Sequence, residues 1–219
     1  MDAAFRFGVL ASGEGTTLDA LAEEIAIGRL PAAIALVVID RPNARAIERA
    51  RRRELPTLLL PSRGVDREEW SDRLTRELDD HGVRLVVLTG FLSILPASWV
   101  AHWRGRALNI HPSLLPKYGG MGMYGAHVHE AVLAGGETET GVTVQLVTEE
   151  VDGGPALVQE AVPVEPGDTP ATLRARVHPV EVRLLSETIR RFALGELPLP
   201  YPLRPGESFR AGATSPRSA

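Results

Sequence analysis

The chain has 219 residues, of which 44% are hydrophobic, so it is long enough for one sizeable domain with its own core. Its formal net charge of -4 argues against binding to nucleic acid, which requires a strongly basic surface. The absence of cysteine excludes disulfides, thiolate nucleophiles and cysteine-ligated zinc.

The apolar runs and the amino terminus argue against two further classes. No apolar run reaches the ~18 residues that a membrane span needs. The first residues also lack the positively charged region, followed by a long apolar segment, with which an export signal begins. We therefore expect a soluble cytoplasmic protein, with neither a membrane nor nucleic acid as a partner. We also expect small-molecule partners and a monomer or homodimer.

The first 110 residues alternate between short apolar runs and helical patterns. Strands are predicted at residues 5–10, 33–39, 57–60, 84–89 and 107–110. Helices are predicted after residue 17, over 44–53, and from an Asp66 cap to His81-Gly82. Crossovers of this length imply right-handed βαβ units. This half therefore predicts an α/β, Rossmann-like fold with a doubly wound, mostly parallel sheet.

The pattern changes after residue 110. A glycine-rich loop at 119–125 leads into a predicted helix over 125–134. Strands at 142–147 and 156–162 are close enough for a hairpin, and a long last helix follows Asp168-Thr169-Pro170. We expect a single domain over residues 1–200, with halves at 1–110 and 111–200, and a flexible tail over 203–219.

A polar pair stands at the end of the fifth apolar run, where Asn109 and His111 flank Ile110. Alternation along a strand sends Asn109 and His111 to the same side of the sheet. Pro112 cannot continue a central strand, so the chain should leave the sheet there. The pair then reaches a carboxyl end of the sheet, where open α/β folds bind ligands. An incidental polar pair is the alternative.

The loop after the first strand is a second candidate, with Gly13, Gly15, Thr16 and Thr17. It is an incomplete dinucleotide motif because Leu18 stands at the third glycine position, and no lysine follows for a P-loop. Small residues and hydroxyls at the start of a helix favour a phosphate or another anion. The alternative is a tight turn in which Thr16 or Thr17 only caps the helix.

The acidic hairpin tip is the third candidate, because Asp152 precedes Gly153 and Gly154. Acidic residues are common in turns, but adjacent glycines let the backbone approach a ligand closely. Asn109, His111 and Asp152 together suit acyl transfer without a covalent enzyme intermediate. Asn109 and a protonated His111 would stabilise the oxygen that gains negative charge. Asp152 would keep His111 protonated and assist proton movement from the amine.

Four segments of the chain resemble the 10-formyltetrahydrofolate-dependent formyltransferase family, and within it the phosphoribosylglycinamide formyltransferases of purine synthesis. The resemblance covers roughly residues 5–197 in order and spacing. The segments are Ala11-Ser12-Gly13-Glu14-Gly15-Thr16-Thr17-Leu18, Leu88-Thr89-Gly90-Phe91-Leu92-Ser93-Ile94-Leu95, Asn109-Ile110-His111-Pro112-Ser113-Leu114-Leu115-Pro116 and Val151-Asp152-Gly153-Gly154-Pro155.

This resemblance implies transfer of a formyl group from the co-substrate 10-formyltetrahydrofolate to the amine of glycinamide ribonucleotide, without a metal. It assigns catalysis to Asn109, His111 and Asp152. The nucleotide-binding residues that it implies are Gly15, Thr16, Thr17 and Glu181. The folate-binding residues that it implies are Arg67, Leu92, Ser93, Ile94, Leu95, Asn109, Thr148, Glu149, Glu150, Val151 and Asp152.

The chain departs from the family pattern at three positions, which hold Thr17 in place of Asn, Ser93 in place of a basic residue, and Val182 in place of His. The loop at 119–125 is longer than the common form, whose glycine leads almost directly into a His-x-His. Here His127 and His129 hold those places, and we assign His127 as a candidate on the substrate side or directly behind it. The three catalytic candidates are unaffected.

Three alternatives remain open. Another amine could accept the formyl group, such as that of an amino-sugar nucleotide or of initiator methionyl-tRNA. The tRNA alternative is weak, because we expect no added carboxyl-terminal domain and the sequence shows no cluster of basic residues that would bind tRNA. A deformylase would use water in place of the amine and usually has an extra regulatory domain in front, and we expect none before Phe5. A folate- or nucleotide-binding module without catalysis is the alternative from a different class.

Overall fold

The central sheet is built from the apolar runs that the sequence predicts as strands. The computed structural model describes residues 4–203 and 209–210, and in these the strands are β1 (Phe5–Ala11), β2 (Ala32–Ile39), β3 (Thr57–Leu59), β4 (Leu85–Leu88), β5 (Ala107–His111), β6 (Glu139–Leu146), β7 (Ala156–Pro163) and β8 (Phe209–Arg210). Their order in the sheet is β3-β2-β1-β4-β5-β6-β7-β8. The pairs from β3 to β5 are parallel, whereas β6 is antiparallel to both β5 and β7. The predicted mostly parallel sheet with a later hairpin is therefore confirmed.

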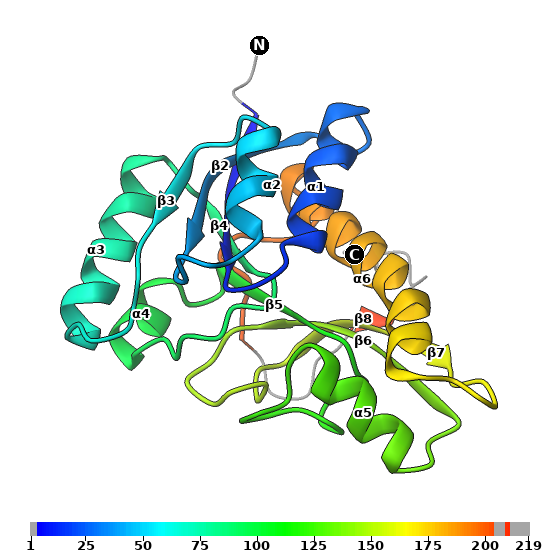
Figure 1. Cartoon of the computed structure of the whole chain (residues 1–219). Coiled ribbons are helices and arrows are strands. Elements are labelled where there is room, and N and C mark those ends of the chain that lie inside the picture. Colours follow the sequence, from blue (N-terminus) through cyan, green and yellow to red (C-terminus); the bar gives the residue numbers. More distant parts are fainter. Residues whose placement is uncertain (1–3, 204–208, 211–219) are drawn as a thin grey trace.

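Helices cover both faces of this sheet, as Figure 1 shows. One apolar core lies under α1 (Thr16–Ala26), α2 (Ala46–Arg52), α5 (Ala126–Ala134) and α6 (Pro170–Ala193). The second core lies under α3 (Arg67–Asp80) and α4 (Ala97–His102). Because helices cover both faces of the sheet, β2 and β4 are continuous apolar runs, and β1 is apolar apart from the exposed Arg6 near its start. This is the doubly wound arrangement that the sequence predicts.

Helix boundaries follow local signals where those signals are strong. The Asp66 side chain accepts hydrogen bonds from the backbone nitrogens of Glu68 and Glu69, which confirms the predicted cap of α3. The long helix α6 begins at Pro170, with Thr169 as the first member of a capping box. Helix α4 is not predictable from the sequence, because a helix of six residues is too short for a periodic pattern.

Most predicted strands agree with the structure to within one or two residues. Strand β6 is the exception, because it begins at Glu139 whereas the prediction began at residue 142. The added residues pair with the end of β7, and Glu139 lies opposite Pro163. The pairing partner, which local sequence does not reveal, extends this strand. Of the tail predicted to be flexible over 203–219, residues 209–210 form β8 against β7, and 204–208 and 211–219 lie outside the described residues.

The hairpin between β6 and β7 closes with very little room. At Gly154, an added Cβ would lie 1.8 Å from the carbonyl oxygen of Leu146, the last residue of β6. Because that oxygen belongs to the backbone of the sheet, it cannot move aside at low cost. Gly154 therefore fixes how closely the hairpin tip, which carries Asp152, returns to the sheet. Within residues 4–203 and 209–210, no helix is long and apolar enough to cross a membrane.

We predict that Gly154→Ala destabilises the protein by about 2 kcal/mol or more, because the new methyl group would clash with backbone. For a protein of this size the melting temperature should fall by roughly 4–8 °C in a thermal unfolding experiment. The matched control is Gly13→Ala, since an added Cβ at Gly13 meets no atom within 4 Å. Equal melting temperatures for Gly154→Ala and the wild type would show that the hairpin tip is not closely constrained.

Candidate active site

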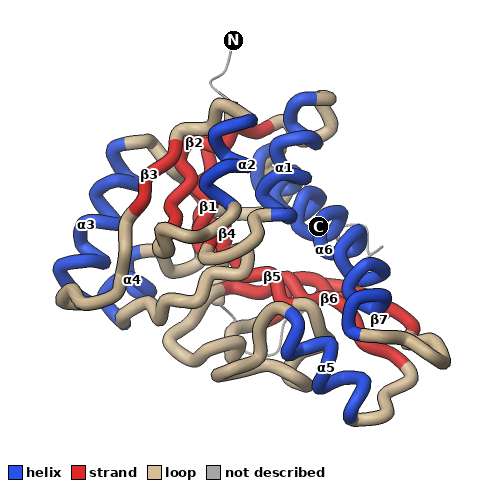
Figure 2. The backbone as a smooth tube through the Cα atoms, viewed as in Figure 1, coloured by secondary structure: helices blue, strands red, loops and turns tan. Residues whose placement is uncertain are grey.

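One large cavity lies at the carboxyl ends of the central parallel strands. Its volume is about 560 Å³. Loops, drawn tan in Figure 2, gather in this region beside helix α5. The walls come from the loops after β1, β4 and β5, the glycine-rich loop, the β6–β7 tip and one side of α6. The candidate segments, which are far apart in the sequence, therefore surround one cavity, in the position where open α/β sheets bind ligands.

The carboxylate of Asp152 lies at the centre of the polar contacts in this cavity. Its Oδ1 accepts hydrogen bonds from Asn109 Nδ2 at 3.1 Å and from Gln145 Nε2 at 2.9 Å. Its Oδ2 accepts one from the backbone nitrogen of Gly120 at 2.9 Å. The side chain is only 8% exposed, so these donors replace the water that a buried carboxylate has lost. Asp152 therefore joins β5, β6 and the glycine-rich loop.

His111 is held between two acceptors. Its Nδ1 lies 3.5 Å from Asp152 Oδ2, and its Nε2 lies 2.7 Å from the backbone oxygen of Tyr118. A carbonyl oxygen only accepts hydrogen bonds, so Nε2 must carry the hydrogen in this contact. The ring nitrogen that faces the carboxylate is therefore Nδ1. The distance from Nδ1 to Asp152 Oδ2 is longer than a good hydrogen bond, so Nδ1 is available to contact a ligand.

Strand register explains why these side chains meet. Asn109 lies directly opposite Gln145, and His111 lies opposite Thr143, in the antiparallel pair of β5 and β6. Alternation along both strands brings the four side chains to one face. The shared face predicted for Asn109 and His111 is confirmed, as is the end of the strand before Pro112. Gln145 was not among the predicted site residues, because only the register of β6 against β5 identifies it.

The loop after β1 opens helix α1 toward the cavity. Gly15 is the N-cap residue with φ 70, and an added Cβ there would lie 2.8 Å from Ala46 Cα. No side chain caps the helix, so the alternative that Thr16 or Thr17 serves only as a cap is wrong. Gly15, Thr16 and Thr17 all line the cavity. Free backbone nitrogens, hydroxyls and a helix dipole together make this a suitable anion site.

Helix α6 forms the opposite wall with residues at i, i+4 and i+7 spacing. These are Arg174, His178 and Glu181, which lie on one side of the helix and line the cavity. Burial raises the pKa of Glu181 to about 7, and the nearby Arg174 opposes that shift. Burial lowers the pKa of His178, and Arg174 adds to that effect. Arg174 and His178 were not among the predicted site residues, because in the sequence they resemble ordinary surface residues of a helix.

A buried histidine on α5 is a further wall residue. His129 is 2% exposed and lines the cavity, whereas His127, the candidate from the sequence, does not. Burial lowers the pKa of His129 to about 4, and the positive charge of Arg174 adds to the shift. The ring of His127 instead lies against Tyr124, with centroids 5.0 Å apart. His129 should therefore be neutral near pH 7.

The residues assigned to folate by resemblance divide into two groups. Those lining the cavity are Leu92, Ser93, Ile94, Leu95, Asn109, Thr148, Glu149, Glu150, Val151 and Asp152. Arg67 does not line it, and is instead the exposed first residue of α3. Ser93 Oγ donates to the buried Asp40 at 2.5 Å, so Ser62 Oγ, 2.6 Å away, must donate to Ser93. The Ser93 hydroxyl therefore already has two partners within the protein.

Comparisons with known proteins agree on one family. Residues 5–189 match the family model described as formyl transferase. Phosphoribosylglycinamide formyltransferase of Escherichia coli (strain K12) is 39% identical over 190 residues, which cover 86% of this chain and 87% of that protein. The crystal structure of glycinamide ribonucleotide transformylase 1 from Symbiobacterium toebii has a TM-score of 0.83 at 38% identity, covering 91% of this chain and 92% of that one.

A further solved structure is similar over the same length. The phosphoribosylglycinamide formyltransferase of Coxiella burnetii, in complex with CHES, has a TM-score of 0.82 at 39% identity. The similarity covers 89% of this chain and 90% of that one. The similar proteins therefore share both the architecture and most of the length of this chain.

The raised pKa of Glu181 predicts a pH-dependent stability. Because the folded state binds this proton more tightly than the unfolded state, the stabilisation is complete below an ordinary carboxyl pKa of 4.5 and is lost as pH rises through about 7. We therefore predict that the melting temperature of the wild type falls, relative to that of Glu181→Gln, between about pH 5 and about pH 8. Glu187→Gln, at an exposed position of α6, is the control. A constant difference between the melting temperatures of the wild type and Glu181→Gln across this pH range would contradict the prediction.

Proposed function

The chain belongs to the formyl transferase family, and from this membership we propose that it transfers a formyl group from 10-formyltetrahydrofolate to the amine of glycinamide ribonucleotide, N1-(5-phosphoribosyl)glycinamide, in purine synthesis. The observation that carries the proposal is the buried polar group of Asn109, His111 and Asp152 in a cavity that also contains an anion-suited helix start. An amine, a formyl carbon and a phosphate are the three groups that such a cavity must accept.

In the proposed reaction the amine nitrogen attacks the formyl carbon. A carbon–nitrogen bond forms to the glycinamide, the bond to the folate nitrogen breaks, and the proton lost by the amine reaches the departing nitrogen. Negative charge develops on the formyl oxygen in between. Asn109 Nδ2 and His111 Nδ1 are the nearby donors suited to stabilise it, since His111 Nε2 is occupied by Tyr118.

Asp152 has two tasks in this scheme. Its negative charge beside His111 Nδ1 would stabilise positive charge on the ring while the oxyanion is present. Its carboxylate can also accept the amine proton directly or through water. The three hydrogen bonds from Asn109, Gln145 and Gly120 hold the carboxylate in place for both tasks. The absence of a cysteine nucleophile is compatible with direct attack by the amine.

The two substrates would occupy different parts of the cavity. We assign the phosphate to Gly15, Thr16 and Thr17, and the ribose or glycinamide end to Glu181 on the facing wall. The folate would lie against the apolar side chains of the loop after β4 and against the β6–β7 tip. In this arrangement the reacting atoms would meet beside Asp152.

We predict that the purified protein converts glycinamide ribonucleotide and 10-formyltetrahydrofolate into the N-formyl product and tetrahydrofolate. Product formation can be followed by the absorbance change of the folate and confirmed by mass spectrometry. An amino-sugar nucleotide serves as the comparison acceptor. If the protein bound both substrates but formed no product, the proposed reaction would be wrong.

We predict that Asp152→Asn lowers kcat by about 10²–10⁴-fold, because the variant loses the proton acceptor and the charge beside His111. The binding of both substrates should change far less, because Asn has the same shape. Steady-state kinetics and ligand titration measure the two effects. Asp72→Asn, at an exposed position of α3, controls for loss of one negative charge. An unchanged kcat in Asp152→Asn would remove Asp152 from proton transfer.

A further inference from the structure

Two residues in an unfavourable backbone conformation lie on either side of His111. Tyr118 has φ 56 and Asp152 has φ 55, and among residues 4–203 and 209–210 the only other non-glycine residue with positive φ is Glu54. Tyr118 supplies the acceptor for His111 Nε2, and Asp152 faces Nδ1. A left-handed conformation costs a bulky residue about 1–3 kcal/mol and persists only where surrounding contacts enforce it. Something must therefore hold Tyr118 in place.

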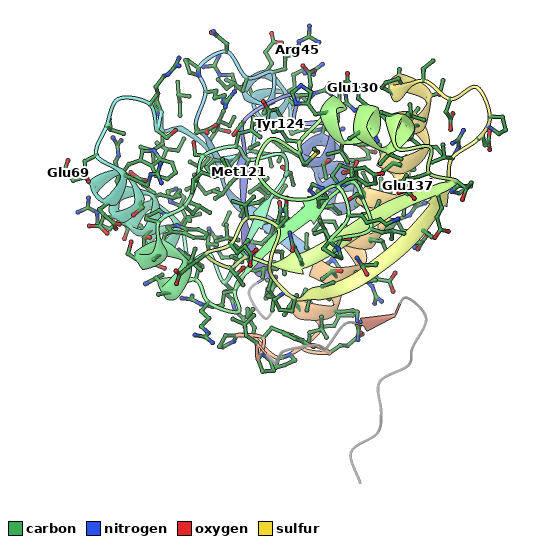
Figure 3. All side chains as sticks on the ribbon, turned by 90° about the horizontal axis from the view of Figure 1, so that it is seen from below. Arg45, Glu69, Met121, Tyr124, Glu130 and Glu137 are labelled. Carbon is green, nitrogen blue, oxygen red and sulfur yellow. The ribbon has the colours of Figure 1, made fainter. Side chains whose placement is uncertain are left out.

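The ring of Tyr118 packs against the apolar core, and its hydroxyl makes a polar contact on the outside of the loop. The Tyr118 hydroxyl donates to Glu137 Oε1 at 2.9 Å. Glu137 lies between α5 and β6 with its side chain 25% exposed, and Figure 3 shows it well separated in that view from Met121 and Tyr124 of the glycine-rich loop. It does not line the active-site cavity. The hydrogen bond raises the pKa of the Tyr118 phenol, which keeps its proton in place for this contact.

Glu137 also forms an ion pair with Lys117, and this pair can be removed without removing the Tyr118 hydrogen bond. Lys117 Nζ lies 3.0 Å from Glu137 Oε1 and 3.2 Å from Oε2, and the Lys117 side chain is 69% exposed. Such an exposed ion pair contributes little to stability. The backbone oxygen of Lys117 is fixed independently, because it accepts from Ser113 Oγ at 2.6 Å. Removing the lysine charge should therefore leave the Tyr118 backbone where it is.

We propose that Glu137 is a positioning residue for the reaction: by accepting the Tyr118 hydroxyl hydrogen bond, it holds Tyr118 in the conformation that aims its carbonyl oxygen at His111 Nε2. This inference rests on the proposed formyl transfer and adds a residue outside the cavity to it. With Nε2–H fixed on the Tyr118 oxygen, Nδ1 is the nitrogen that remains for Asp152 and the reacting oxygen. Without the outer contact, Tyr118 relaxes toward negative φ and its carbonyl turns away from the ring.

The test compares four variants of the full chain. Tyr118→Phe and Glu137→Ala each remove the hydrogen bond, and each should lower kcat by about tenfold while both KM values stay near those of the wild type, because misplacing a reacting group slows chemistry more than binding. Glu137→Gln keeps an acceptor for the Tyr118 hydroxyl and should stay near the wild type. Lys117→Met removes only the ion pair and should also stay near it.

A double variant and a spectroscopic measurement separate positioning from general stability. Tyr118→Phe combined with Glu137→Ala should lose no more activity than either single variant, because both remove one contact. Nitrogen-15 NMR of the His111 ring in its neutral form should show mostly Nε2–H in the wild type and a smaller Nε2–H population in these variants. Because NMR needs no substrate, failure of the wild type to transfer formyl groups would count against the proposed function alone.

Three results would overturn the positioning role. The first is a wild-type Nε2–H population and wild-type kcat in Tyr118→Phe and Glu137→Ala, even if their melting temperatures fall. The second is an equal loss of activity in Lys117→Met, which would point to surface charge. The third is additive losses in the double variant, which would mean that Tyr118 and Glu137 act separately.

Discussion

A carboxylate that is almost completely removed from water must be surrounded by donors, and the candidate active site is arranged around this requirement of Asp152. An unpaired buried charge is very costly, whereas one that accepts several hydrogen bonds is tolerated. The donors come from β5, β6 and the glycine-rich loop, through Asn109, Gln145 and Gly120. Satisfying one charge therefore fixes three segments relative to one another, and it does so beside the cavity wall where His111 lies.

These three segments can meet at Asp152 because the sheet contains both parallel and antiparallel strands. Parallel strands β1, β4 and β5 bring their carboxyl ends to one edge, so the loops after them share the cavity. Strand β6 then runs antiparallel to β5, which sets Gln145 opposite Asn109. Its hairpin with β7 returns the tip to the same edge and carries Asp152 with it. A wholly parallel continuation would have placed the next loop after a long crossover instead.

The sequence predicted those features that depend on local patterns or short motifs. Apolar runs identified the parallel strands, and alternation correctly placed Asn109 and His111 on one face. Contacts that depend on register or on backbone atoms were not predictable. Gln145 required the pairing of β5 with β6, and the Tyr118 partner of His111 is a carbonyl that every residue possesses. Arg67 was assigned by resemblance alone, and it lies on the exposed start of α3.

Backbone conformation also limits what can stand at the two positions flanking His111. Asp tolerates the left-handed region better than most residues, because its short side chain can hydrogen-bond locally, so the φ of Asp152 is modestly unfavourable. Tyr118 has no such compensation, and its conformation must be enforced through contacts of the side chain. The hydroxyl of Tyr118 reaches Glu137 on one side of the loop while its carbonyl reaches His111 on the other. Tyr118 thus connects the Glu137 carboxylate, outside the cavity, to the His111 ring at the centre of the site. A glycine would adopt the same φ without strain, but it has no side chain that could hold the backbone in that conformation. A tyrosine therefore suits this turn better than a glycine.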